Sequence, residues 1–240
     1  NVDIVIHLAS EVKYENGDNI YENNINGTKY LLRSIGQRNR DKVKKIIFTS
    51  SIGAIDRSKN DNCDKPLDLK ATANPSSYYG YSKLVGEKLI RKFSKNNVIL
   101  RICWCYGKYM TSDTHMKFLF ESTKKNKLFS FFNFPGKVSI IHIDELINIL
   151  IFFMESSKSN VTYYVNDGQP ISLGKMFKEY KRHFGKKFMI NIPKFVTSSF
   201  KFFKGILPFK IKTLFMDTMV ADDAMLKEIR DIKINKFFPE

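Results

Sequence analysis

The chain has 240 residues, of which 43% are hydrophobic, so it can bury a sizeable core in one extended domain or in one domain with a small lobe. Its net charge of +16 comes from 40 Lys and Arg against 24 Asp and Glu, a balance that suits nucleic acid, anionic lipid or a phosphorylated substrate. No RNA-stacking motif or zinc-finger spacing supports nucleic acid, and we interpret the lysines mainly as a solvated surface. No segment reaches the roughly 18 apolar residues of a membrane span. The three cysteines, Cys63, Cys103 and Cys105, lack metal-ligand spacing.

Strands and helices alternate through the first hundred residues, as a doubly wound parallel sheet requires. We expect strands near residues 4–8, 46–49 and 98–102, and helices near 21–37 and 79–93. The polar segment 56–74 between them is expected to lie over a ligand site. The pattern then changes, with helices near 116–124, 144–154 and 173–184 and strands near 138–141 and 162–165. In residues 193–215 phenylalanine and lysine interleave, which favours a helix closing a small lobe over a segment lying on a membrane.

Tyr79 and Lys83 stand four residues apart at the expected start of a helix, so both side chains project from one face. A lysine ammonium beside a phenol favours the phenolate and lowers a tyrosine pKa from its reference of roughly 10, which suits a general acid or base. On spacing alone, such a pair is more often a solvated helix face. The neighbouring strands decide between these interpretations.

Two apolar runs end in small or polar residues at the carboxyl ends of expected strands. They are Lys45-Ile46-Ile47-Phe48-Thr49-Ser50-Ser51 and Asp3-Ile4-Val5-Ile6-His7-Leu8-Ala9-Ser10. Open α/β sheets bind ligands at this end of their strands, and small side chains there let a flat ligand approach the backbone. We therefore expect a ligand site beside Tyr79 and Lys83.

With these segments the chain resembles the extended short-chain dehydrogenase/reductase superfamily, in particular the NAD-dependent epimerase/dehydratase family, over nearly its whole length. Further motifs follow in the family's order, at Asn24-Ile25-Asn26-Gly27-Thr28, Leu100-Arg101 through Tyr106-Gly107, His142-Ile143-Asp144 and Tyr163 through Leu173. The resemblance implies an α/β fold, a Rossmann-like doubly wound parallel sheet with a smaller C-terminal α/β substrate lobe. Residues 1–107 would form the remainder of the dinucleotide-binding domain, and residues 108–240 mainly the substrate lobe, interleaved with the last strands of the sheet.

One motif of the family does not occur in the 240 residues. Its Gly-x-x-Gly-x-x-Gly turn, which seats the cofactor pyrophosphate on a helix N-terminus, should precede the strand at Asp3. The opening residues resemble the fourth strand of the fold, so roughly 60 to 70 residues are expected upstream. We interpret the chain as N-terminally incomplete, and a natural short form that binds no dinucleotide is the alternative.

The resemblance also implies residue roles. Tyr79 would be the catalytic acid or base, Lys83 its electrostatic partner on the nicotinamide ribose, and Ser51 the hydroxyl between the substrate oxygen and the phenol, with Ser50 as the fallback. The cofactor would be lined by Leu8, Ala9, Ser10, Asn24, Thr49 and Cys103, together with Tyr79 and Lys83, and the substrate by Ser51, Trp104 and His142. Arg101 is expected to tie its strand end to neighbouring backbone, His7 to be a core histidine, and Asp144 to be a helix N-cap.

Two departures from the family pattern narrow the chemistry. Dehydratases carry an acidic pair after the catalytic hydroxyl, where this chain has Ile52 and Gly53. Trp104 stands where many 4-epimerases carry Asn. A Trp at this position resembles the pattern of deoxysugar-nucleotide reductases. We expect a cytoplasmic, homodimeric oxidoreductase or epimerase that uses NAD or NADP, with NAD slightly favoured, on a nucleotide-linked sugar and without a metal. A reductase of a non-sugar ketone, hydroxysteroid- or dihydroflavonol-like, and a non-catalytic binding protein of the same fold are the alternatives.

Overall fold

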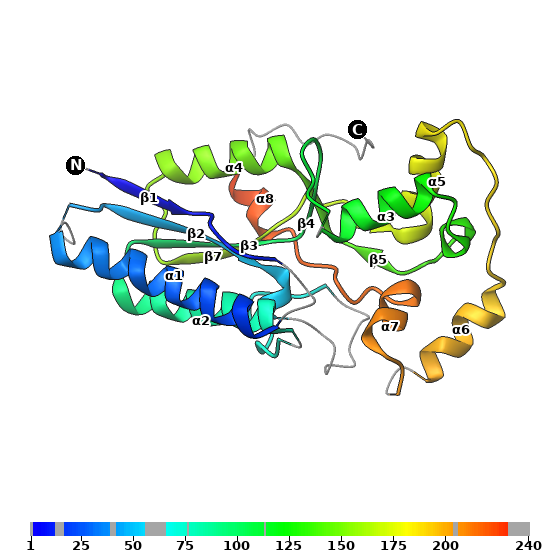
Figure 1. The fold of residues 1–240 in the computed structure, drawn as a ribbon, viewed down its shortest axis with the longest axis horizontal. Helices are drawn as coiled ribbons and strands as arrows, with labels where there is room; N and C mark the ends of the chain where they lie inside the picture. Colours follow the sequence, from blue (N-terminus) through cyan, green and yellow to red (C-terminus); the bar gives the residue numbers. More distant parts are fainter. Residues whose placement is uncertain are drawn as a thin grey trace.

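A four-stranded parallel sheet forms the centre of the computed structural model, which describes residues 2–12, 17–38, 42–55, 66–75, 77–112, 114–203 and 206–229. Its strands stand in the order β1 (Ile4–His7), β2 (Lys45–Ser51), β3 (Asn97–Ile102) and β7 (Val161–Val165) (Figure 1). The two middle strands are buried almost throughout, as expected for strands covered on both faces.

Helices cover both faces of this sheet (Figure 1). On one face lie α1 (Gly17–Arg38) and α2 (Tyr78–Phe93), and on the other α4 (Ile143–Glu155) and the short α8 (Ala224–Glu228). Successive side chains of β2 point to opposite faces, so Ile46 and Phe48 pack in the core under α1 and α2, whereas Ile47 packs in the core under α4. The α/β fold with a doubly wound parallel sheet is thereby confirmed.

Lys45, the first residue of β2, connects the sheet to the end of α4. Its Nζ donates to the carbonyl oxygen of Phe153 at 2.8 Å and also to that of Ser156. These carbonyls belong to the last turn of α4 and to its C-cap, and that last turn carries no basic residue of its own. A lysine from a distant strand therefore satisfies the negative end of this helix.

The second half of the chain adds smaller elements around a separate core. They are β4 (Trp104–Tyr106) paired with β6 (Ile140–His142), β5 (Lys137–Val138) paired with β8 (Ile171–Ser172), the 3-10 turns η1 (Ile52–Ala54) and η2 (Leu128–Phe131), and the helices α3 (His115–Lys124), α5 (Leu173–His183), α6 (Lys194–Phe202) and α7 (Phe209–Phe215). Met116 of α3 and Phe177 of α5 are both buried in this core. Because β7 returns to the large sheet, the division at residue 107 remains a prediction.

The predicted strand at residues 138–141 is two strands, β5 and β6, that separate at Ser139. The backbone N–H of Ser139 donates to the Met219 carbonyl and its Oγ accepts from the Ala221 N–H. The backbone of a segment about eighty residues downstream thus forms the hydrogen bonds of Ser139 and interrupts the strand there. The local sequence pattern does not reveal this. Of the predicted irregular segment 56–74, residues 56–65 lie outside the described part, as does Cys63.

The composition led us to expect the lysines mainly on a solvated surface, but some of them are buried. Lys45, Lys83, Lys181 and Lys212 are all buried. Lys181 places its ammonium 3.1 Å from the centroid of the Phe131 ring and donates to a backbone carbonyl. Among the described residues, no helix is long and apolar enough to cross a membrane.

Candidate active site

Lys83 lies where α2 crosses the end of β2. Only 4% of its surface is exposed, and its Nζ donates to the Thr49 carbonyl oxygen at 2.8 Å. The ammonium lies 5.8 Å from the centroid of the Tyr79 ring, one helical turn earlier, and 5.1 Å from that of Phe48. Burial lowers the pKa of Lys83 from 10.5 to about 8. The structure therefore brings together three of the predicted site residues, with a buried lysine that is close to titrating at physiological pH.

The start of α2 is pressed against the turn that follows β2. Ser77 caps the helix by accepting from the Gly80 N–H at 3.0 Å. A Cβ at Gly80 would lie 2.2 Å from the Gly53 carbonyl oxygen, so only glycine fits at this contact. In the same turn the Ser51 Oγ accepts from the Gly53 N–H at 3.1 Å. This backbone contact between Gly53 and Gly80 holds the Ser51 turn beside the helical turn that carries Tyr79.

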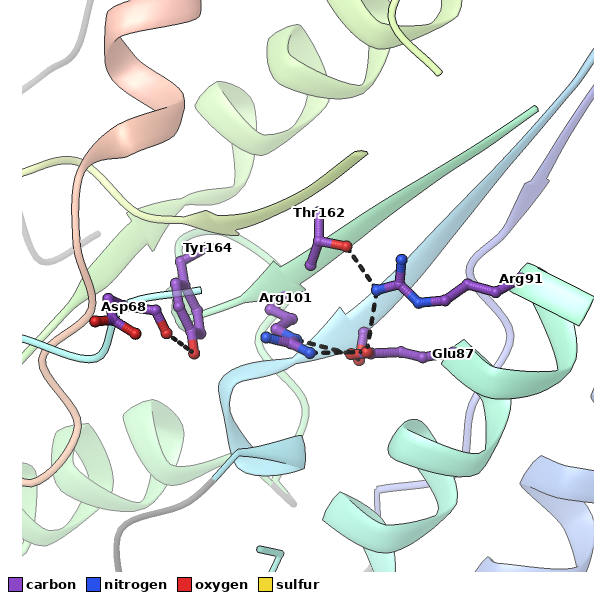
Figure 2. Close-up of polar contacts among 7 residues, drawn as sticks. Asp68, Glu87, Arg91, Arg101, Thr162 and Tyr164 are labelled. Carbon is purple, nitrogen blue, oxygen red and sulfur yellow. Dashed lines mark hydrogen bonds and ion pairs between the residues drawn. The ribbon is translucent and has the colours of Figure 1, made fainter. Parts of the chain in front are cut away.

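Ser50 points into a buried ionic network rather than toward the Ser51 turn. Its Oγ donates to a carboxylate oxygen of Glu87 at 2.6 Å. Arg101 binds both oxygens of the same carboxylate, each at 2.9 Å, and Figure 2 shows Glu87 between Arg101 and Arg91. The predicted anchor of Arg101 on neighbouring backbone is therefore wrong, because its partner is a side chain of α2. With Ser50 engaged in this way, Ser51 is the serine left available for a ligand.

Glu87 had no role in the sequence analysis, although it stands four residues after Lys83 on the same helix. That spacing places both side chains on the face of α2 that packs on the sheet. A glutamate on a buried helical face requires a cation, and Arg101 on the neighbouring strand supplies it. Figure 2 also shows Tyr164 next to Arg101, with its hydroxyl donating to the Asp68 carbonyl at 3.2 Å.

His7 is a buried core histidine, as predicted. Thr28 donates its hydroxyl proton to the Asn24 carbonyl at 2.9 Å, so the 2.9 Å contact between Thr28 Oγ1 and His7 Nε2 requires the ring nitrogen to donate. Burial, reinforced by the charge of Lys83, lowers the pKa of His7 to about 4. This histidine is therefore neutral at physiological pH and holds β1 against α1.

Asn24 joins three segments around the predicted cofactor edge. Its amide nitrogen donates to Ser82 Oγ at 3.0 Å and to the Glu11 carbonyl at 3.1 Å, and its amide oxygen accepts from the Glu11 N–H at 2.8 Å. Both hydrogen bonds to Glu11 fix the chain just after β1. Asn24 thus orders the edge of the predicted site, which a sequence motif alone could not specify.

The other predicted cofactor residues lie at the carboxyl end of the sheet, with different exposure. Leu8 and Ala9 follow β1 and are exposed, and Ser10 is half-buried. Cys103 follows β3, is buried in the core of the second half, and donates its backbone N–H to the Val165 carbonyl. Burial raises the pKa of the Cys103 thiol well above its ordinary value, so this side chain is not a thiolate.

Trp104 and His142 lie on the small sheet of β4 and β6, beyond the end of the large one. Trp104 is half-buried and stacks on His115 with ring centroids 5.0 Å apart. His142 is the N-cap of α4, because its Nδ1 accepts from the Asp144 N–H at 3.3 Å. The prediction of Asp144 as the N-cap is therefore wrong. Asp144 stands in the first turn, where its charge complements the helix dipole.

A buried acidic pair near this small sheet was also not foreseen. Asp167 and Glu145 are both buried, and burial, reinforced by the Glu145 charge, raises the pKa of Asp167 to about 7. A hydrogen bond from the Gln169 N–H at 2.9 Å opposes this rise. The Asp167 carboxyl group thus titrates near neutral pH.

Comparison with known proteins agrees with this geometry. The model of the NAD dependent epimerase/dehydratase family matches residues 1–165. A protein of Methanocaldococcus jannaschii named putative UDP-glucose 4-epimerase is 34% identical over 115 residues, which are 45% of this chain and 36% of that protein. Cinnamoyl-CoA reductase 2 of Medicago truncatula is 32% identical over 101 residues, 40% of this chain and 29% of that protein. The chain thus spans about a third of the length of these relatives.

A solved structure shows the same fold. The UDP-glucuronic acid 4-epimerase of Bacillus cereus, in complex with NAD, superposes with a TM-score of 0.67 at 23% identity and covers 80% of this chain and 63% of its own. Together with the match over residues 1–165 and the arrangement of Ser51, Tyr79 and Lys83 around the end of β2, these likenesses lead to one conclusion. The chain belongs to the NAD-dependent epimerase/dehydratase family.

Proposed function

We propose that the protein is an NAD(P)-dependent oxidoreductase or epimerase that acts at a hydroxyl or carbonyl carbon of a nucleotide-linked sugar. The observation that carries this proposal is the position of Lys83. A buried ammonium costs free energy, and here it is held by one hydrogen bond to the Thr49 carbonyl beside the Tyr79 ring. A merely structural lysine would have no need of a neighbouring phenol one turn earlier on the same face of the helix. The arrangement suits proton transfer at the Tyr79 hydroxyl.

The residues present fit the nicotinamide half of the cofactor. Lys83 has three N–H donors and uses one on Thr49, so it retains donors for ribose hydroxyls. Leu8 and Ala9 are exposed at the carboxyl end of β1, where open α/β sheets bind dinucleotides. No Gly-x-x-Gly-x-x-Gly occurs in the 240 residues, so none of them supplies the usual pyrophosphate turn. When bound, the nicotinamide supplies the acceptor and donor of a hydride.

The protein's own residues handle the proton and orient the substrate. We assign Tyr79 as the group that takes the proton from the substrate hydroxyl and returns it. The Lys83 ammonium and the positive N-terminus of α2 both favour the phenolate during this exchange. Ser51 accepts from the Gly53 N–H, which leaves its own proton to donate to the substrate oxygen. Trp104 and His142 are proposed to contact the substrate. Residues 1–107 are proposed to belong to the dinucleotide-binding part, which also carries Ser51 and Trp104, and residues 108–240 to form most of the substrate lobe.

Two relatives favour different substrates. The nucleotide sugar is supported by the UDP-sugar epimerases, of which the Bacillus cereus enzyme was crystallised with NAD, and this also favours NAD slightly over NADP. A ketone or thioester reductase is supported by the likeness to a cinnamoyl-CoA reductase. Dehydration is not proposed, because Ile52 is buried and Gly53 packs on Gly80, so neither position offers an acid.

The test is turnover of UDP-glucose to UDP-galactose by the protein with NAD, in wild type and in Tyr79→Phe. Removing the hydroxyl should lower kcat by about 10²- to 10⁴-fold, with little change in affinity for NADH measured by fluorescence. Tyr81→Phe is the matched control, since this exposed tyrosine of the same helix should leave kcat unchanged.

Full activity of Tyr79→Phe would refute the assignment of the acid or base. Reduction of cinnamoyl-CoA without turnover of either UDP-sugar would select the reductase. A protein that binds NADH and turns over neither class would instead be the non-catalytic member of the fold.

A further inference from the structure

The helix α6 and the turn after it expose several large apolar side chains. Phe195, Phe202, Phe203 and Ile206 are exposed by 74%, 88%, 56% and 80% respectively. We call these four residues the α6 face. Single exposed apolar residues are normal on protein surfaces, but four large ones between residues 195 and 206 point to an interaction site.

The opposite side of α6 is anchored to the protein. Phe200 stacks on Phe215 of α7, with ring centroids 3.8 Å apart and planes 5° from parallel. Phe195 and Phe202 are seven residues apart, nearly two helical turns, so they project from one side, whereas Phe200 lies about 140° away around the helix. The sequence predicts a helix that closes the small lobe. In the described part of the structure, only the side of α6 that bears Phe200 packs on the protein in this way.

Figure 1 shows α6 at the opposite end of the molecule from β1, connected to α5 by an extended segment. The strands of the large sheet point toward this half of the molecule, and α6 lies at its far edge, beyond α7.

The charge around α6 selects the partner. From residue 180 to residue 216 the sequence contains no Asp or Glu, while it carries Lys181, Arg182, Lys186, Lys187, Lys194, Lys201, Lys204, Lys210 and Lys212. Of these, Arg182, Lys187 and Lys194 are exposed, whereas Lys181 and Lys212 are buried. Exposed aromatic side chains flanked by lysine suit the interface of an anionic bilayer, where rings enter the acyl boundary and ammonium groups remain among the headgroups.

We propose that the α6 face is a peripheral docking site for an anionic lipid bilayer. Phe195 and Phe202 enter the interface, Phe203 and Ile206 extend the contact past the helix, and the surrounding lysines add electrostatic attraction. A helix this short contributes a small apolar area, so binding requires both the aromatic and the electrostatic components. Reversible association is the expected mode.

Flotation with vesicles tests the proposal. The protein should float with vesicles of phosphatidylcholine containing about 30% phosphatidylserine and stay behind with phosphatidylcholine alone. Raising the salt toward about 1 M should release it, because the Debye length falls to about 3 Å. The double variant Phe195→Ser/Phe202→Ser should lower the vesicle partition coefficient by about 100-fold, roughly tenfold for each ring withdrawn from the interface.

The matched control is Tyr30→Ser, which removes a ring that is 63% exposed on α1. It should leave partitioning unchanged, and the double variant should keep the wild-type unfolding midpoint because its rings make few contacts. Equal flotation with neutral and anionic vesicles, no flotation, or wild-type flotation of the double variant would each overturn the proposal. A dimer in solution that Phe195→Ser/Phe202→Ser dissociates would assign the face to a second copy of the chain instead.

Discussion

Replacing Lys83 by methionine gives a quantitative test of the burial described for this residue. In the folded chain its pKa is about 8, against 10.5 in the unfolded one. Below pH 8 both states hold the proton, and between pH 8 and 10.5 the unfolded state holds more, so the stability of the wild type must rise with pH in that window. About 1.4 kcal/mol per pKa unit converts the shift into about 3 kcal/mol.

Lys83→Met has a similar length and no charge, so this rise should be absent from its pH profile. The measurement is the free energy of unfolding from urea titrations between pH 7 and 10.5, with the difference between wild type and variant taken at each pH. Loss of the hydrogen bond to Thr49 shifts the variant by a pH-independent amount, so only the slope of the difference is diagnostic. The control is Lys88→Met, an exposed lysine of the same helix. Parallel profiles for wild type and Lys83→Met would refute the buried-ammonium reasoning.

Three further variants probe features of the same fold. Glu87→Gln leaves the Arg101 charge buried without its carboxylate and should cost about 3 kcal/mol or more in urea unfolding, whereas a loss below about 1 kcal/mol would show that the network is solvated. Gly80→Ala puts a Cβ 2.2 Å from the Gly53 carbonyl oxygen, so the start of α2 must shift. We expect a lowered melting temperature together with reduced NADH binding. A wild-type melting temperature would argue against the contact. The pKa of Asp167 is about 7 in the folded chain and 3.8 in the unfolded one, so the free energy of unfolding should fall by up to about 4 kcal/mol as pH rises between these values. Asp167→Asn should abolish that fall in calorimetry at successive pH values. An unchanged fall would assign it to other groups.

The regular elements around the site were predictable from local pattern. The strand predicted at 46–49 and the helix predicted at 79–93 match β2 and α2 to within two residues at each end, because a fully buried strand and an amphipathic helix leave strong signals. The spacing of Tyr79 and Lys83 also specified that both side chains lie on one face of α2, which the 5.8 Å contact confirms.

What escaped prediction depends on tertiary partners. The ion pair between Arg101 and Glu87 could not be predicted, because it depends on how α2 packs on β3, and neither segment's sequence indicates that packing. His142 rather than Asp144 is the N-cap because the first helical residue of α4 is Ile143, so Asp144 already lies inside the helix. The exposure of Phe195 and Phe202 was likewise hidden, since a phenylalanine-rich sequence reads as a core helix until its neighbours are known.

The hydrogen bonds from Lys45 to the end of α4 bear on how the chain acquires its structure. The lysine enters early in the sequence, but its carbonyl partners, at Phe153 and Ser156, are more than a hundred residues downstream. A fragment that stopped at Gly107 would leave this ammonium without those acceptors and would expose Ile47 to water, because α4 covers it. The cover of the large sheet therefore depends on residues from both sides of position 107. In synthesis from the N-terminus, the large sheet gains its cover on that side only after α4 has emerged.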